Sequence, residues 1–200
     1  MHKRSGIHAQ TDPCQLGIAT LIVIPASPVM ADEAPWVADA RNIATTMPPK
    51  MMEVLKEETK KSGSANATIV CREKAPAMAK SVSEQSGWNI RRVSLRERNP
   101  KAVPDDWERA VLEDFDRRAA AGEDGAKMEK SELVAVGGKT EQRYMKALPT
   151  QAMCMTCHGA PATLDADLTE QLRKLYPDDK AVGYRPGDIR GAITMKKSGE

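Results

Sequence analysis

The sequence predicts an α+β fold in which N-terminal helices precede an antiparallel sheet. Two observations carry this prediction. Apolar residues with helical spacing fill the first part of the chain, whereas segments with strand character prevail after residue 89. A Gly-Gly pair between two such segments indicates a β-hairpin, and helices before strands are typical of the α+β class. The length of 200 residues suits one domain with a short helical extension.

Two helices are expected in the first part of the chain. Residues 36–61 place Val37, Ala40, Ile43 and Ala44 on one face, and we expect Pro48-Pro49 to interrupt this helix. Ser62-Gly63-Ser64 marks a break. Residues 65–86 then form a second helix with Pro76 as a kink or a new start, and its apolar stripe comprises Ala67, Cys71, Ala75, Met78 and Val82.

The later part of the chain alternates strands and helices. Residues 89–95 predict a strand, and Asp105 or Asp106 caps a helix that runs to about residue 121. Residues 132–136 and 141–148 flank Gly137-Gly138 as the two strands of a hairpin. A short helix over residues 167–175 and a strand over residues 189–195 complete the prediction.

The first 31 residues are typical of a secretory signal peptide. Lys3 and Arg4 precede the apolar run LGIATLIVI, which is too short to span a bilayer. Val29-Met30-Ala31 ends on a small residue, so we expect cleavage after Ala31, export to the periplasm and no stable membrane anchor afterwards. The formal net charge of +2 gives no indication of a nucleic-acid partner.

Cys154-Met155-Thr156-Cys157-His158 is the C-x-x-C-H pattern of c-type haem attachment. On one helical turn, residues i and i+3 share a face, so both thiols reach the two vinyl groups at one haem edge. His158 then becomes an axial ligand of the iron. We therefore predict one covalent haem c, bound through Cys154, Cys157 and His158.

Two other uses of the same residues are less favoured. A thioredoxin-like dithiol needs a strand before it and a long helix after it, but Gly159-Ala160-Pro161 follows at once. A structural zinc site needs four ligands, which Cys71 would have to complete.

The second axial ligand is left open by the residues themselves. Cleavage after Ala31 would remove His2, His8 and Cys14, so the mature chain would retain one histidine and three cysteines. The candidates are Met195, the leftover thiol of Cys71, or no protein ligand at all. Cys71 has small helical neighbours, but it is equally explained as a small buried hydrophobic residue.

Several separate motifs resemble one known family. They include Ile69-Val70-Cys71, Ala75-Pro76, Arg92-Val93-Ser94-Leu95-Arg96, Arg98-Asn99-Pro100, Cys154 to Pro161, Tyr176-Pro177-Asp178, Gly183-Tyr184 and Gly187-Asp188-Ile189-Arg190-Gly191. Over roughly residues 36–198 the chain resembles the bacterial and cyanobacterial c-type haem domains of unknown function with a PAS-like fold. The resemblance implies a PAS-like α+β domain around one haem c. We expect residues 32–64 to form an N-terminal helical segment and residues 65–200 to form the PAS-like haem domain.

The resemblance also implies the ligands and the function. It matches Cys71 to a thiolate opposite His158, and a thiolate favours ferric iron. We expect a redox or small-ligand sensor that acts through a protein partner, with a periplasmic electron carrier, possibly His/Met ligated, as the alternative. An enzyme is not expected, because no second histidine remains for acid-base chemistry. Arg92 and Arg98 are either surface arginines or partners of the haem propionates, since guanidinium groups bind carboxylates bidentately.

Overall fold

A four-stranded antiparallel sheet lies at the centre of the structure, a computed structural model that describes residues 33–199. The strand order is β1-β4-β3-β2, so β4 at the end of the domain lies between the first strand and the hairpin. The strands are β1 (Asn89–Val93), β2 (Glu129–Val136), β3 (Lys139–Pro149) and β4 (Ile189–Ser198). The α+β class, the hairpin and the N-terminal helices are confirmed. The expected signal peptide, residues 1–31, lies outside the described residues.

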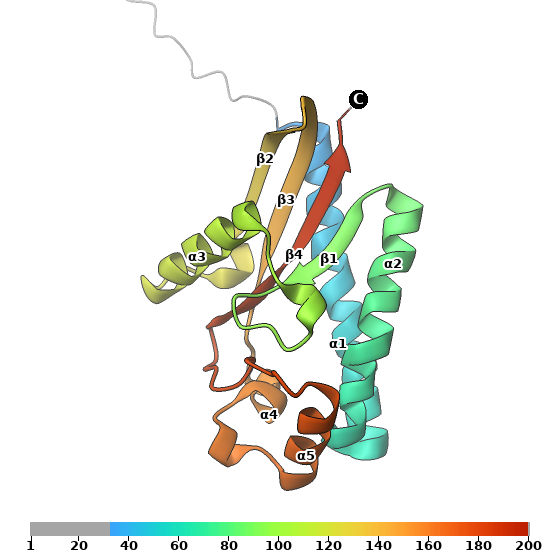
Figure 1. Ribbon diagram of the computed structural model, residues 1–200, viewed down its shortest axis with the longest axis vertical. Helices are drawn as coiled ribbons and strands as arrows, with labels where there is room; N and C mark the ends of the chain where they lie inside the picture. The colour runs from blue at the N-terminus through green and yellow to red at the C-terminus, as the bar shows by residue number, and fades with distance from the viewer. Residues whose placement is uncertain (1–32, 200) are drawn as a thin grey trace, which may run out of the picture. The chain divides into compact units, whose positions relative to one another are not determined.

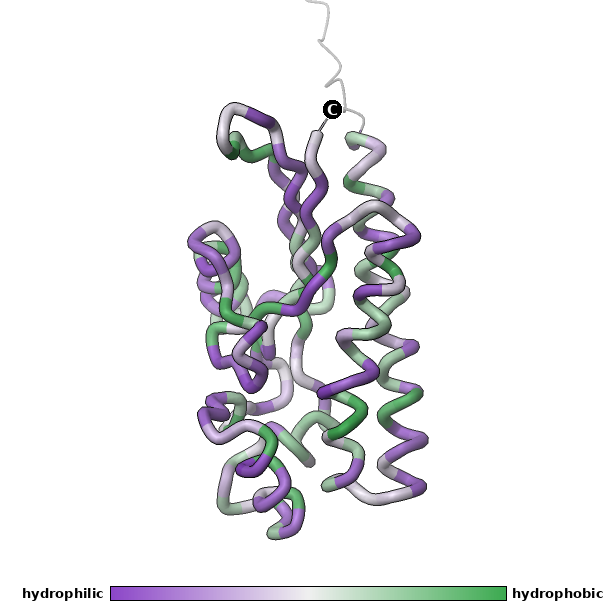
Figure 2. Tube along the Cα trace, turned by 45° about the vertical axis from the view of Figure 1, so that its right-hand side comes forward, coloured by the Kyte–Doolittle hydropathy of each residue, from purple (hydrophilic) through white to green (hydrophobic). Residues whose placement is uncertain are grey.

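A helical hairpin forms the first part of the described chain. Helix α1 (Pro35–Ile69) turns back on itself at Gly63, whose φ of 82° lies in the left-handed region that favours glycine. Figure 2 shows the two arms of the hairpin side by side, with the pale turn at their lower end.

The expected interruption at Pro48-Pro49 is wrong, since α1 continues through both prolines. Upstream of them, Val37, Ala40 and Ala44 are buried against the sheet, and this packing outweighs the two missing backbone donors. The break at Gly63 and the new start at Pro76 are confirmed. A π-helical segment, η1 (Val70–Lys74), links α1 to α2 (Ala75–Ser86).

The two faces of the sheet carry separate cores. The α1 side packs on one face around the buried side chains of Trp88, Tyr144 and Met195. Helix α3 (Asp106–Ala120) packs on the other face through Leu112 and Phe115, each of which stabilises the fold by about 1.5–3 kcal/mol. Figure 1 shows α3 and the helical hairpin on opposite sides of the strands.

Helix α3 begins where the sequence predicts. Asp105 caps it by accepting from the Glu108 backbone N–H at 2.9 Å, and the Glu108 carboxylate accepts from the Asp105 backbone N–H at 2.8 Å. Short 3-10 turns precede and follow this helix, η2 (Pro100–Ala102) and η3 (Gly125–Lys127).

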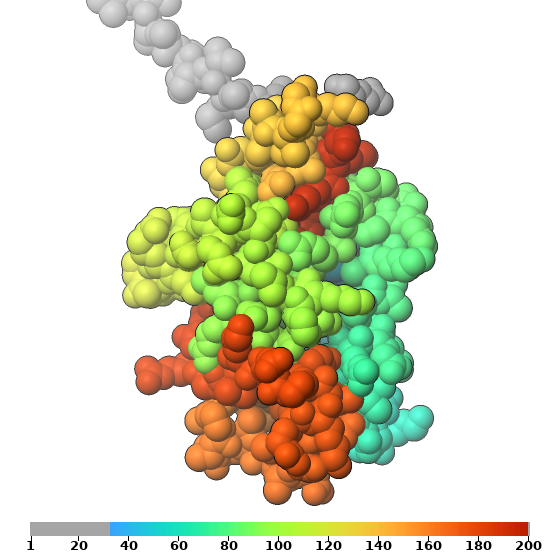
Figure 3. Space-filling model, in the orientation of Figure 1, coloured from blue at the N-terminus to red at the C-terminus, as the bar shows by residue number. Residues whose placement is uncertain are grey.

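A small helical lobe is inserted between β3 and β4. It comprises η4 (Ala152–Cys154), α4 (Met155–His158), η5 (Pro161–Thr163) and α5 (Ala166–Leu175). Buried Leu168, Leu172 and Tyr176 form its core, against which Cys157 packs. In Figure 3 this orange-to-red lobe lies against the teal part of the helical hairpin. No helix within residues 33–199 is both long enough and apolar enough to cross a membrane.

Candidate functional site

Cys154, Cys157 and His158 lie on consecutive turns at the start of the helical lobe. Cys154 ends η4, and the single turn of α4 carries Cys157 and His158. All three cysteines of the described chain are free, so no disulfide joins Cys154 to Cys157. We call residues 154–158 the attachment turn.

Backbone hydrogen bonds join the attachment turn to the loop before β4. The N–H of Tyr184 donates to the carbonyl of His158 at 2.9 Å, and the N–H of Gly183 donates to the carbonyl of Gly159 at 2.7 Å. A Cβ at Gly159 would lie 2.6 Å from the Met155 carbonyl oxygen. The close approach that ends the turn therefore needs glycine at position 159.

The imidazole of His158 has a fixed orientation. Its Nδ1 lies 2.6 Å from the carbonyl oxygen of Ala181, which can only accept, so Nδ1 carries the proton. Burial, together with the cations of Arg190 and Arg98, lowers the pKa of His158 to about 2. The ring is therefore neutral, and Nε2 keeps a lone pair for a metal.

Arg98 holds the attachment turn from the other side. Its Nε donates to the Asp179 carboxylate at 2.8 Å, and its Nη2 donates to the carbonyl of Cys157 at 2.6 Å. The side chains of Arg98 and Asp179 are 10% and 12% exposed. Asp179 also accepts from the N–H of Ala181 at 2.8 Å. The buried ion pair therefore positions the carbonyl that orients His158.

Cys71 lies on the π-helical segment of the helical hairpin. The N–H of Ala75 donates to the carbonyl of Val70, a separation of five residues that defines a π-helix. Pro76 has no N–H for the carbonyl of Arg72, and its ring would clash with that carbonyl in a regular α-helix. The widened turn at Cys71 thus follows from the Ala75-Pro76 sequence, and such turns occur frequently at functional sites.

Cys71 is accessible to water, yet burial raises the pKa of its thiol. The positive charges of Arg92, Arg98 and Arg190 act in the opposite direction and favour the thiolate. Cys154 also acts on this pKa, which brings Cys71 and the attachment turn into one site.

Arg190 is a site residue to which the sequence analysis assigned no role. It is 7% exposed, and its Nε lies 3.3 Å from Nδ1 and 3.5 Å from Nε2 of His158. Its Nη1 donates to the hydroxyl of Ser94 at 2.9 Å. The neighbouring Gly191 has a φ of 151°, and a Cβ there would lie 2.2 Å from the Val93 carbonyl oxygen. The Asp-Ile-Arg-Gly motif could have indicated Arg190, because its glycine is the residue that allows β4 to approach β1 closely at this point.

The predicted site residues are thus brought together with one exception. Arg92 is exposed on β1, yet burial lowers the pKa of its guanidinium, and both Cys71 and Cys154 act on that pKa. Met195 instead is fully buried in the core with Trp88 and Tyr144.

The competing zinc interpretation receives no support from the structure. Within residues 33–199, no group of three or more His, Cys, Asp or Glu side chains is arranged to hold a metal ion.

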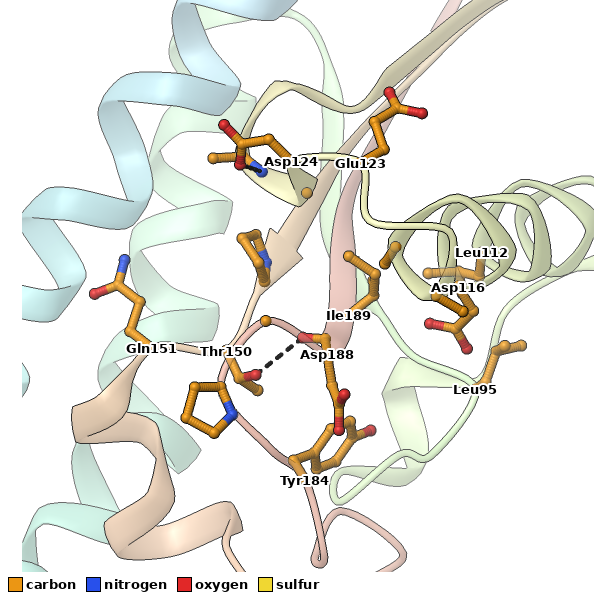
Figure 4. Close-up of a pocket in the computed structure, with 18 of the residues that line it drawn as sticks. Leu95, Leu112, Asp116, Glu123, Asp124, Thr150, Gln151, Tyr184, Asp188 and Ile189 are labelled. Carbon is orange, nitrogen blue, oxygen red and sulfur yellow. Dashed lines mark hydrogen bonds between the residues drawn. The ribbon is translucent and has the colours of Figure 1, made fainter.

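A separate cavity of ≈ 790 Å³ lies on the α3 side of the sheet. Figure 4 shows it between Asp116 and Leu112 of α3, Thr150 after β3, and Asp188 before β4. Thr150 donates to the backbone carbonyl of Asp188 at 3.0 Å at its edge. None of the predicted site residues lines this cavity, so it is distinct from the site around the attachment turn.

Comparison with known proteins gives one family and one solved structure. The model of the Tll0287-like family matches residues 33–198. The crystal structure of the cyanobacterial haem protein Tll0287 is similar with a TM-score of 0.60 and 23% sequence identity. The similarity covers 84% of this chain and 98% of that one. No curated protein matches the chain.

Proposed function

The chain belongs to the Tll0287-like family, and from this premise we propose that it is a monohaem c-type cytochrome. The observation that carries the proposal is the attachment turn, which sets Cys154 and Cys157 beside a neutral His158 with its Nε2 lone pair available. The similar cyanobacterial structure is that of a haem protein, which supports the same cofactor here.

The residues of the site suit a covalent haem. Cys154 and Cys157 would form the two thioether bonds, and His158 would ligate the iron through Nε2. The bound haem would supply a one-electron ferric/ferrous couple. The hydrogen bond to Ala181 holds the imidazole orientation and makes Nε2 a better donor.

Cys71 is proposed as the second axial ligand. The charges of Cys154 and of three arginines act on the pKa of its thiol, and the arginine cations favour the deprotonated form. A thiolate ligand stabilises ferric iron, whereas methionine would raise the potential. The burial of Met195 in the core speaks for Cys71 over the His/Met alternative.

We propose redox or small-ligand sensing as the function. Cys71 would hold the iron only as a thiolate, so protonation of its sulfur would free a position for a small ligand. The antiparallel sheet with helices on both faces supports the PAS-like assignment, a fold that suits sensing by analogy. The readout would pass to a redox or signalling protein partner.

Location is part of the same proposal. Covalent attachment takes place outside the cytoplasm in bacteria, and residues 1–31 have the pattern of a cleaved signal peptide. We therefore propose a periplasmic protein with cleavage after Ala31.

The test of attachment is an extraction. The chain is expressed with cytochrome c maturation factors, beside a control in which Cys154 and Cys157 are both replaced by Ala. We expect acid-acetone to leave the haem on the wild-type protein, and haem that extracts from it would contradict the proposal.

A second measurement separates sensing from electron transfer. The reduced protein is exposed to carbon monoxide: a sensor whose thiol leaves binds the gas, whereas a six-coordinate electron carrier excludes it.

A further inference from the structure

Arg190 has a buried positive charge that no carboxylate of the described chain neutralises. Its hydrogen-bonding partners are the Ser94 hydroxyl at 2.9 Å and the Arg96 carbonyl at 3.3 Å, and its Nε lies 3.3 and 3.5 Å from the two ring nitrogens of His158. None of these partners is anionic. Its Nη2 donates to no acceptor within residues 33–199.

The other arginines that are not exposed all have an acidic partner. Each of them forms a salt bridge with an aspartate or a glutamate: Arg41, Arg91, Arg98, Arg118 and Arg143. Arg190 is therefore the exception among the buried and half-buried arginines of the described residues. Because an unpaired buried charge is strongly unfavourable, this exception calls for an anion that is not part of the chain.

Arg92 is a second cation without an acidic partner at the same site, although the residue is exposed and not buried. It lies on β1 opposite Ile193, and no hydrogen bond or salt bridge to its side chain occurs within residues 33–199. Burial lowers the pKa of its guanidinium although the residue is exposed, and its charge acts on both Cys71 and His158. Two cations without acidic partners thus face the space between Cys71 and the attachment turn.

Arg98, the third cation, is already neutralised. Its partner Asp179 lies 2.8 Å from Nε, and Nη2 donates to the carbonyls of Cys157 and Ala181 at 2.6 and 3.3 Å. A second carboxylate at Arg98 would compete with Asp179 and with the bonds that hold the attachment turn.

Resting on the proposed function, we propose that Arg190 and Arg92 bind the two propionate carboxylates of the haem, and that Arg98 positions the attachment turn instead. Two unneutralised guanidinium groups match two propionates in number and in charge. A guanidinium is also the group that binds a carboxylate bidentately. The proposal replaces Arg98 by Arg190 in the pair expected from the sequence.

The test compares the haem propionate bending modes of purified holoproteins by resonance Raman spectroscopy. Arg190→Gln and Arg92→Gln should each shift one of the two propionate modes to lower frequency, and the double variant should shift both. Each single variant should also lower the midpoint potential, because a positive charge near the haem is lost. The exposed Arg109→Gln is the control and should leave both modes in place, and Arg98→Gln tests the rival assignment of a propionate to Arg98.

The outcomes separate this proposal from the proposed function. If the wild type carries no covalent haem after acid-acetone extraction, the proposed function is wrong. If the wild type carries covalent haem but both propionate modes are unchanged in Arg190→Gln, the assignment of Arg190 is overturned. A shifted propionate mode in Arg98→Gln would then assign that propionate to Arg98. Arg190→Lys keeps the positive charge, so its midpoint potential should lie closer to that of the wild type than the potential of Arg190→Gln does. If the glutamine variant does not fold, the propionate modes of Arg190→Lys are compared with those of the wild type instead.

Discussion

Replacing Arg98 by glutamine removes the cation of the ion pair that holds the attachment turn. Arg98 and Asp179 are 10% and 12% exposed, so the substitution leaves the Asp179 carboxylate buried without its counter-ion. Breaking a buried pair in this way costs about 3–5 kcal/mol of unfolding free energy. The lost bond to the Cys157 carbonyl is part of the same change.

Arg117→Gln is the matched control for this substitution. Arg117 also pairs with an aspartate, Asp114, but its side chain is 73% exposed, and an exposed pair contributes at most about 1 kcal/mol. The same chemical change is thus made in a buried pair and in an exposed one.

The assay is urea unfolding of the two variants and the wild type, followed by the fluorescence of the buried Trp88 and by circular dichroism. We expect Arg98→Gln to lower the urea midpoint far more than Arg117→Gln, with an unchanged slope. Equal effects of the two substitutions would refute the role given to the Arg98–Asp179 pair.

Three further predictions concern the pH dependence, the core and the attachment turn. In a variant without the attachment cysteines, we expect the pKa of His158 to be about 2 in the folded chain and about 6.5 in the unfolded chain. The contribution of the neutral His158 to the unfolding free energy is then complete above pH 6.5. Below pH 6.5 the unfolding free energy falls by up to about 1.4 kcal/mol per pH unit, because the unfolded chain binds the extra proton. Urea titrations should show this component vanish in His158→Gln, and an unchanged slope would contradict it. Glu108→Ala should cost about 3–5 kcal/mol, measured by thermal unfolding, because the fully buried carboxylate accepts from Thr194 at 2.9 Å and pairs with Arg91. Gly159→Ala should lower the yield of covalent haem, because its Cβ would lie 2.6 Å from the Met155 carbonyl oxygen; a yield equal to that of the wild type would mean that the turn tolerates a side chain.

Local signals in the sequence predicted much of the fold. Gly137-Gly138 marked the hairpin, and Asp105 marked the start of α3, because turns and caps depend on a few neighbouring residues. The prediction that Pro48-Pro49 interrupts the first helix was wrong, since the packing of distant residues on the sheet decides whether a helix continues through a proline. The order of the strands is likewise a tertiary property that periodicity does not contain.

In the candidate site, too, local features were predicted from the sequence and long-range contacts were not. The spacing of Cys154, Cys157 and His158 is local, and the structure places the three on the expected turn. The carbonyl of Ala181 and the side chain of Arg190 reach His158 from more than twenty residues away, so no spacing rule indicates them. Arg98 and Arg190 carry the same charge in the sequence, and only the position of Asp179 distinguishes their roles.

The central claim is that Cys71 and His158 ligate one covalent haem from opposite sides, and the ferric spectrum of the Cys71→Ala variant tests it most directly. The wild type should be low-spin with a thiolate-to-iron charge-transfer band and a low midpoint potential. Cys71→Ala should lose that band and bind carbon monoxide readily when reduced, and Cys71→Met should stay six-coordinate at a higher potential. Identical spectra and potentials for the wild type and Cys71→Ala would contradict the account, because Cys71 would then be no ligand.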